Sequence, residues 1–171
     1  MKKTMIILML STLPFLAGAQ NFIDNVFSKY SGKDNFTSIV ISKDLLDLVF
    51  SVDSNKEVDK IKGKIADLKI LVSDNEKNGG VVGFTNEVRE SINKENYLSL
   101  MEVLNGKEKV NFYVKKDNDR IVHLLLIATG KDEEVLLSLR GNFSMKDLSE
   151  LGKGCHDGTL HHLSNLKNLE K

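Results

Sequence analysis

Four side chains near the C-terminus have the types and the spacing that bind metal ions. Cys155, His156, His161 and His162 gather the only cysteine and three of the four histidines of the chain within one short segment. Imidazole and thiolate are preferred ligands of zinc and copper, so the pattern predicts a candidate metal site. Three glycines between residues 152 and 158 make this segment costly to order. The alternative interpretation is a tail with weak, adventitious metal affinity.

Other catalytic patterns find little support in the sequence. Cys155 has no second cysteine in a Cys-x-x-Cys pair, and the adjacent His156 does not fix the geometry of a base, so a free thiol is expected. No serine lies in a Gly-x-Ser-x-Gly elbow. Residues 79–83 lack the Lys-Ser/Thr ending of a phosphate-binding loop. No catalytic residue and no cofactor are therefore predicted, and an enzyme of another class stays open as an alternative.

His123 is the only histidine outside the tail. It lies on a predicted central strand, where alternation places it on one face with Ile121, Leu125 and Ile127. A histidine among apolar neighbours is more often a hydrogen-bonded structural residue than a catalyst, because catalysis needs polar partners in a cleft. We expect a structural role for His123.

The N-terminus has the three parts of a secretory leader. Lys2 and Lys3 precede an apolar run over residues 5–16, and Ala17-Gly18-Ala19 supplies small residues at a cleavage site. The apolar run is shorter than the roughly 18 residues that indicate a membrane-spanning helix. The sequence therefore predicts export to the periplasm or beyond, with cleavage between Ala19 and Gln20 and no membrane span.

Composition narrows the remaining chain to one domain. Removing residues 1–19 leaves 152 residues, enough for a single core without disulfides. The leader takes two of the 24 basic residues and none of the 24 acidic ones, so the mature charge is −2. That charge argues against a nucleic-acid partner. We predict a signal peptide over 1–19, a single α+β domain over 20–152 and a Cys/His-containing tail over 153–171.

Hydrophobic periodicity and turn residues indicate the elements of this domain. Helices are predicted at residues 22–30, 42–50, 54–68, 88–104 and 144–152, and strands at 36–41, 70–72, 110–115, 121–128 and 135–140. Residues 74–83 are predicted to form a polar loop, and Asn105-Gly106 to end the long helix. The Asp117–Asp119 and Gly130–Asp132 segments are predicted turns. Ser144 and Asp147 have the spacing to cap the last helix.

This order of elements predicts an α+β fold. We expect a mostly antiparallel, five-stranded sheet with helices packed mainly on one face, in a variant of the ferredoxin-like arrangement. Val110, Phe112, Leu124 and Leu126 share one face of two neighbouring strands. If no helix covers that face, it becomes a surface for a protein partner or for self-association. The alternative is that the N-terminal helix at 22–30 covers it.

From the N-terminal helix to residue 151 the chain resembles a family of small exported bacterial proteins catalogued as domain of unknown function 4252. The resemblance is carried by Tyr30-Ser31-Gly32, by "TSIVIS" and "DLKILV", and by "VNFYVKKDNDRIVHLLLIATG" and "VLLSLRGNFSMKDLSEL". It implies an exported protein, often encoded near an alternative sigma factor and its membrane regulator. It implies no activity, cofactor or catalytic residue, and it does not include the Cys/His tail.

The sequence as a whole favours a non-enzymatic function. We predict an exported binding or accessory module of the bacterial cell envelope, linked through the family resemblance to envelope stress signalling. The predicted partner is an unidentified protein, or a second copy of the chain, at a sheet face. The alternative function is that of a metal-binding protein that uses Cys155, His156, His161 and His162.

Overall fold

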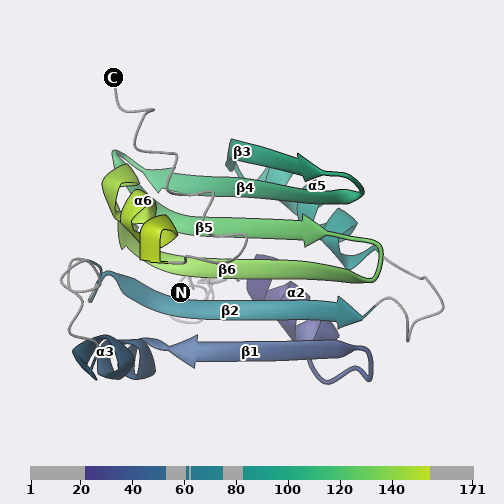
Figure 1. The fold of residues 1–171 in the computed structure, drawn as a ribbon, viewed down its shortest axis with the longest axis horizontal. Helices are drawn as coiled ribbons and strands as arrows, with labels where there is room; N and C mark the ends of the chain where they lie inside the picture. The colour runs from purple at the N-terminus through teal and green to yellow at the C-terminus, as the bar shows by residue number, and fades with distance from the viewer. Residues whose placement is uncertain (1–21, 53–60, 62, 75–82, 155–171) are drawn as a thin grey trace, which may run out of the picture.

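The computed structural model describes residues 22–52, 61, 63–74 and 83–154. Within these residues the chain forms six strands and four helices (Figure 1). The strands are β1 (Phe36–Ser42), β2 (Ile65–Asp74), β3 (Leu98–Asn105), β4 (Glu108–Asp117), β5 (Arg120–Thr129) and β6 (Glu133–Phe143). The helices are α2 (Phe22–Tyr30), α3 (Lys43–Val52), α5 (Phe84–Lys94) and α6 (Met145–Gly154). The α+β prediction is confirmed.

The strands form one antiparallel sheet in the order β1-β2-β6-β5-β4-β3. Strands β3 to β6 are a meander of consecutive hairpins, since each strand pairs with the next one along the chain. The predicted turns are confirmed here, and Asn118 adopts a φ of 52° between β4 and β5, a conformation that asparagine tolerates. β2 joins the free side of β6, and β1 joins β2, so β1 and β3 are the two edges.

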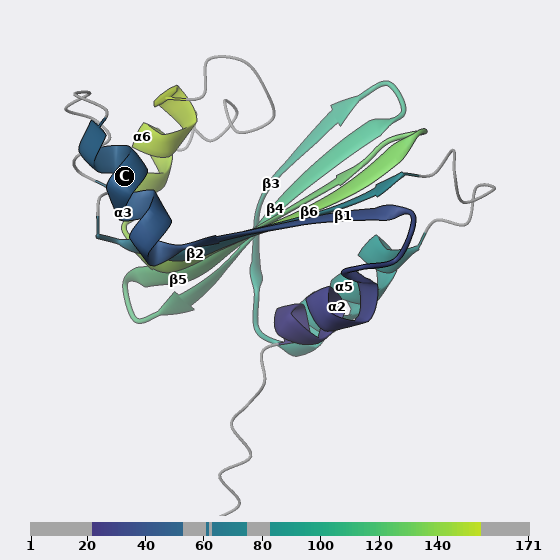
Figure 2. The same cartoon turned by 90° about the horizontal axis from the view of Figure 1, so that it is seen from below.

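The helices lie on both faces of the sheet and at opposite ends. α2 and α5 pack on one face, while α3 and α6 pack on the other (Figure 2). We call the first the covered face, with its core around Leu71, Leu125 and Ile127. We call the second the open face, with its core around Phe112, Leu124 and Leu126. The expectation that helices lie mainly on one face is therefore wrong.

Two amphipathic helices, α2 and α5, form the layer that packs on the covered face. α2 buries Ile23, Val26 and Phe27, one side of a helix by their spacing, as predicted for the N-terminal helix. α5 buries Phe84, Val88 and Ile92 with the same spacing. These side chains meet Leu71, Leu125, Ile127 and Leu136 of the sheet. The N-terminal helix thus covers the face opposite to Val110 and Phe112, and the alternative that it covers their face is wrong.

Side-chain caps start the two helices of the open face. The Ser144 hydroxyl accepts from the Asp147 amide at 3.1 Å, while the Asp147 carboxylate accepts from the Ser144 amide at 2.8 Å. This reciprocal pair is a capping box, so the predicted cap of the last helix is confirmed. Ser42 similarly accepts from the Leu45 amide at 3.5 Å at the start of α3. Both helices begin directly after a strand, which holds them at one end of the sheet.

The predicted long helix over 88–104 is wrong in its second half. α5 ends at Lys94, and Leu98–Asn105 forms the strand β3. The sheet therefore has six strands and not the predicted five. Residues 98–104 include leucine, methionine and glutamate, which favour helices, but pairing with the alternating strand β4 outweighs that preference. Asn105-Gly106 opens the β3–β4 hairpin rather than ending a helix, and Gly106 has the positive φ (60°) that this turn needs.

The predicted helix over 54–68 also differs from the structure. Ile65 and Leu68 belong to β2, which starts at Ile65 and runs to Asp74, so the predicted strand at 70–72 is too short. Residues 53–60 and 75–82, with the capping pair Ser54 and Glu57 and most of the polar loop, lie outside the described residues. The ferredoxin-like detail is not confirmed, because β1 and β2 are immediate antiparallel neighbours with no strand between them.

A substitution at Gly141 of β6 tests how tightly the sheet packs beside the register shift between Ile65 and Asp67 of β2. A Cβ atom at Gly141 would overlap the carbonyl oxygen of Lys64 and the ring of Phe143. We expect Gly141→Ala to lower the free energy of unfolding by about 3 kcal/mol in urea titrations. Gly130→Ala is the control, because its Cβ would meet no atom closer than 3.5 Å. Equal stability of the two variants would contradict this packing.

Candidate functional site

The open face is an apolar surface built by all six strands. Residues directly opposite each other in paired strands share a face, so the register defines continuous rows across the sheet. One row is Thr37, Val72, Val135, Ala128, Val110 and Val103. The next row is Ile39, Ile70, Leu137, Leu126, Phe112 and Met101. Eleven of these twelve residues are apolar, and none is charged.

Burial on the open face decreases from the end that carries α3 and α6 toward the opposite end, where the β3–β4 and β5–β6 hairpins lie. We call this opposite end the hairpin end. Phe112 and Leu126 are buried, with 0% and 3% of their surfaces exposed. Val72, Val110 and Val135, one row further from the helices, are only half-buried. Figure 1 shows α6 and α3 at one end of this face, with no other described helix over the strands. The face therefore keeps apolar side chains that the described part of the chain leaves uncovered.

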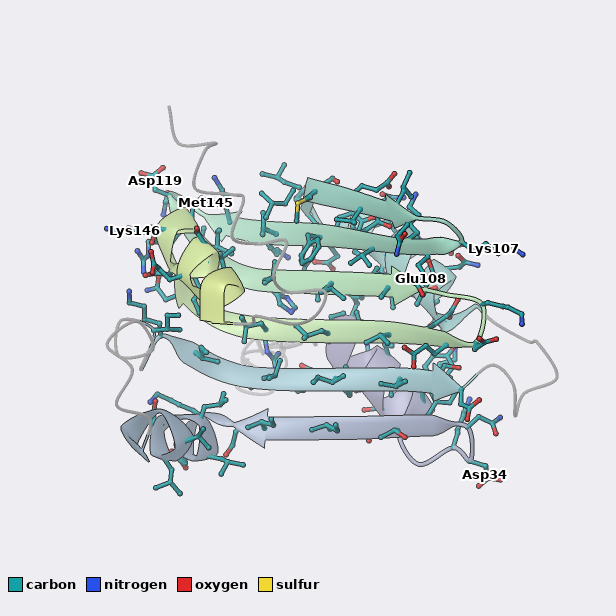
Figure 3. All side chains as sticks on the ribbon, in the orientation of Figure 1. Asp34, Lys107, Glu108, Asp119, Met145 and Lys146 are labelled. Carbon is teal, nitrogen blue, oxygen red and sulfur yellow. The ribbon has the colours of Figure 1, made fainter. Side chains whose placement is uncertain are left out.

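A trough of about 700 Å³ occupies this uncovered end. Its floor consists of Thr37, Val72, Val110, Ala128 and Val135, from five strands. Its rim carries charges of both signs, contributed by Asp74, Lys107, Glu108, Lys131, Asp132 and Glu133. Figure 3 places Lys107 and Glu108 at this hairpin end, and Met145, Lys146 and Asp119 at the opposite end, beside α6. The trough is thus apolar at its base and polar around its border.

The shape and lining of the trough suit binding better than chemistry. Its volume lies in the range of ligand pockets, and a large apolar surface with a polar rim is typical of interaction sites. Among the described residues that line the trough there is no histidine or cysteine. The arrangement accommodates an apolar ligand or the apolar patch of a protein.

The centre of this surface was predicted from the sequence, whereas its borders were not. Val110, Phe112, Leu124 and Leu126 share the open face, as predicted. The rim at Lys107 and the floor at Val72 and Val135 were not predicted as one surface, because the strand order that brings them together is not encoded locally. The alternation of apolar and polar residues over Met101, Glu102 and Val103 is a signal that could have revealed the strand β3.

His123 lies on the covered face in a buried polar network. Its Nδ1 is 2.6 Å from the Tyr97 hydroxyl, and its Nε2 is 2.7 Å from the Ser138 hydroxyl. Ser138 is 0% exposed and His123 is 3% exposed, so both side chains are shielded from solvent. This geometry supports the structural role expected for His123. Ile121 does not share its face, because a register shift between Ile121 and His123 moves Ile121 into the open-face core.

Burial controls the ionisation of this network. It lowers the pKa of His123 to about 3, and the positive charges of Arg140 and Lys115 add to that effect. Burial also raises the pKa of Tyr97 above its ordinary value. His123 is therefore neutral at physiological pH, with one ring nitrogen donating and the other accepting a hydrogen bond.

An ion-pair cluster next to His123 fastens α2 to the sheet. Asp24 of α2 pairs with Lys69 of β2, and it accepts from Arg140 of β6 at 3.1 Å. Arg140 also donates to Asp67 of β2 at 2.8 Å. Burial works to raise the pKa of Asp24, but hydrogen bonds from Lys69 and Arg140 outweigh it and lower that pKa. Each charge thus has an opposite partner, and the cluster is best explained as structural.

The predicted metal ligands Cys155, His156, His161 and His162 lie outside the described residues. The candidate metal site in the tail therefore stays a prediction. Among the residues that the structure does describe, no group of three or more histidine, cysteine, aspartate or glutamate side chains is placed to hold a metal ion. Within the same part of the chain, no helix is long and apolar enough to cross a membrane.

Comparisons with known proteins give one match. A family model described as a domain of unknown function (DUF4252) matches residues 30–151. No curated protein and no solved structure matches the chain significantly. The matched segment includes every residue of the trough and the His123 network, whereas the Cys/His tail lies beyond it.

The buried neutral state of His123 predicts how stability changes with pH. The unfolded chain binds a proton at His123 near pH 6.5, but the folded chain binds it only near pH 3. Stability should therefore be full above pH 6.5 and fall as the pH decreases toward 3. Between pH 7 and pH 5 the loss from this residue is about 2 kcal/mol.

Urea titrations of the wild type and of His123→Gln at the two pH values measure this loss. Glutamine retains a donor and an acceptor but does not titrate, so its stability should change much less between pH 7 and pH 5. The same pH dependence in both proteins would show that His123 is not the residue responsible.

Proposed function

The chain belongs to the DUF4252 family, and on that premise we propose that it is an exported, non-enzymatic binding or accessory module of the bacterial cell envelope. The leader over residues 1–19 supports export. The uncovered apolar end of the open face supports binding, and it is the observation that carries the proposal. A link to envelope stress signalling is the finer part of the proposal, and its support is the family resemblance.

The apolar residues of the open face support a binding function, because apolar surface in contact with water is unfavourable in free energy. Apolar surface gains about 25 cal/mol for each Å² removed from water, and large uncovered apolar patches are uncommon on monomers unless they interact. On this surface the side chains already lie in a rigid, hydrogen-bonded sheet, so a partner has little order to impose on them. The rim charges of both signs provide polar contacts around an apolar centre, as in protein–protein interfaces.

A non-enzymatic role agrees with the placement of the polar groups. The one histidine in the described residues is buried and hydrogen-bonded to Tyr97 and Ser138, away from the trough. The ion pairs of Asp24 and Arg140 also lie on the covered face, where they join α2 to the sheet. The residues that line the trough instead offer apolar contact and exposed charges.

Export has a direct readout in the mature N-terminus. When the full chain is expressed in a Gram-negative host, we expect the product to be found in the periplasmic fraction and to begin at Gln20. N-terminal sequencing or intact mass spectrometry measures this. Replacing Leu8 and Leu10 with lysine should leave the full-length chain in the cytoplasm, because the apolar run is then interrupted. A processed wild type that remains cytoplasmic would contradict export.

Two neighbouring residues of β3 test whether the open face binds. Val103 is half-buried on the open face, while Leu104 points to the opposite face and is 67% exposed. We expect Val103→Glu to weaken binding of a fluorescent apolar probe such as anilinonaphthalene sulfonate at least fivefold, because it places a carboxylate beside the trough. Leu104→Glu is the matched control and should leave probe binding near the wild-type value.

Circular dichroism and the urea midpoint of each variant establish that it is folded before binding is compared. Retention of envelope proteins by immobilised wild type, Val103→Glu and Leu104→Glu then extends the test to natural partners. Equal probe binding and equal retention by both variants would refute the open face as the binding surface.

A further inference from the structure

The two edges of the sheet differ in how they are protected from pairing with another strand. β3 has a register shift between Ser99 and Met101, and its Glu102 is held by Lys109 at 2.8 Å and Asn111 at 2.7 Å. A bulge and a charged residue are the devices that proteins use to discourage edge pairing. β1, the other edge, has neither within its seven residues.

β1 is an edge strand whose sequence favours pairing with another strand. Its sequence, Phe-Thr-Ser-Ile-Val-Ile-Ser, has no charged residue, no proline and no glycine, and four of its seven residues are β-branched apolar residues or threonine. Ile39 is 44% exposed and Val40 is 61% exposed, on opposite faces of the strand. Figure 1 shows β1 along the border of the sheet, with α3 beyond its C-terminal end. Among the described residues, no other strand pairs with its outer side.

The hydrogen bonding of Asn35 shows which backbone groups of β1 face outward. The Asn35 carbonyl accepts from the Asp74 amide of β2 at 3.0 Å, and the β1–β2 register continues from there without a shift. Because successive residues of a strand direct their N–H and C=O groups to alternate sides, Ile39 bonds toward β2. Ser38, Val40 and Ser42 direct their N–H and C=O groups away from the sheet. The Phe36 carbonyl points the same way, but the Phe36 amide already donates to the Lys33 carbonyl at 2.9 Å.

We propose that β1 pairs in antiparallel fashion with β1 of a second copy of this chain. The two-fold axis of such a pair is perpendicular to the sheet, so each copy presents the same face on the same side. Residues opposite each other must then share a face, which excludes registers shifted by one residue. The register that uses all seven residues places Ile39 opposite Ile39 of the second copy, and Ser38 opposite Val40.

A second copy fits this edge because β1 is complementary to another β1 in antiparallel pairing. With no charge between Phe36 and Ser42, antiparallel pairing places no like charges opposite each other. Ser38 and Val40 form two hydrogen-bonded pairs of two bonds each, and each Phe36 carbonyl accepts one bond from the opposite Ser42 amide, about six bonds in total. The apolar row through Ile70 and Ile39 continues into the second copy, so both open faces merge into one surface.

Cysteine crosslinking tests this register. Two cysteines at position 39 form a non-hydrogen-bonded pair with Cα atoms about 4.5 Å apart, within disulfide range. Two cysteines at position 40 lie diagonally, about 7–8 Å apart, beyond that range. In the Cys155→Ser background, oxidised Ile39→Cys should therefore run as a covalent dimer on non-reducing gels, and oxidised Val40→Cys should remain largely a single chain.

Light scattering of the reduced chain provides the second measurement. The wild type should have the mass of two chains, and Ser38→Pro should have the mass of one, because proline removes an outward N–H without touching the β2 ladder. Circular dichroism confirms that Ser38→Pro is folded. A wild type with the mass of one chain, or equal crosslinking at positions 39 and 40, would overturn the proposal. Neither result affects the open-face test, which compares Val103 with Leu104.

Discussion

The two-sided apolar character of β5 is the constraint on which the rest of the structure depends. Leu124 and Leu126 lie on one face and Leu125 and Ile127 on the other, and none is more than 3% exposed. Such a strand is stable only between two layers, so the sheet needs cover on both faces. α2 and α5 cover one face. On the other face, α3 and α6 each follow a strand directly and stay at one end, so no described helix lies over the trough.

The polar groups of the covered face give this arrangement its specificity. Buried polar and charged groups are costly unless they are paired, and here each interaction links different elements of the chain. His123 joins β5 to β6 through Ser138 and to the segment before β3 through Tyr97. Arg140 and Asp24 join the sheet to α2. The covered face therefore contains the polar network that positions α2. On the open face the ion pair of Asp147 with Lys64 lies at the α6 end, and the floor of the trough is apolar.

Local signals predicted those parts of the fold that depend on neighbouring residues. The capping pair of Ser144 and Asp147, the turn at Asn118 and the alternation of β4 follow from side-chain chemistry within a few residues. β3 was missed because its leucines and methionine favour a helix, and only pairing with β4 decides its conformation. The trough could not be predicted, since Val72 and Val135 are far apart in the sequence and meet only through the strand order.

We propose that the open face is the surface through which this protein binds. Carbene footprinting of the purified chain, and of the same chain in its native envelope fraction, measures this residue by residue. Val72, Val110 and Val135 should be labelled in the purified chain and protected in the envelope fraction, while Leu104 on the opposite face should be labelled equally in both. Equal labelling of the three valines in both samples would contradict the claim.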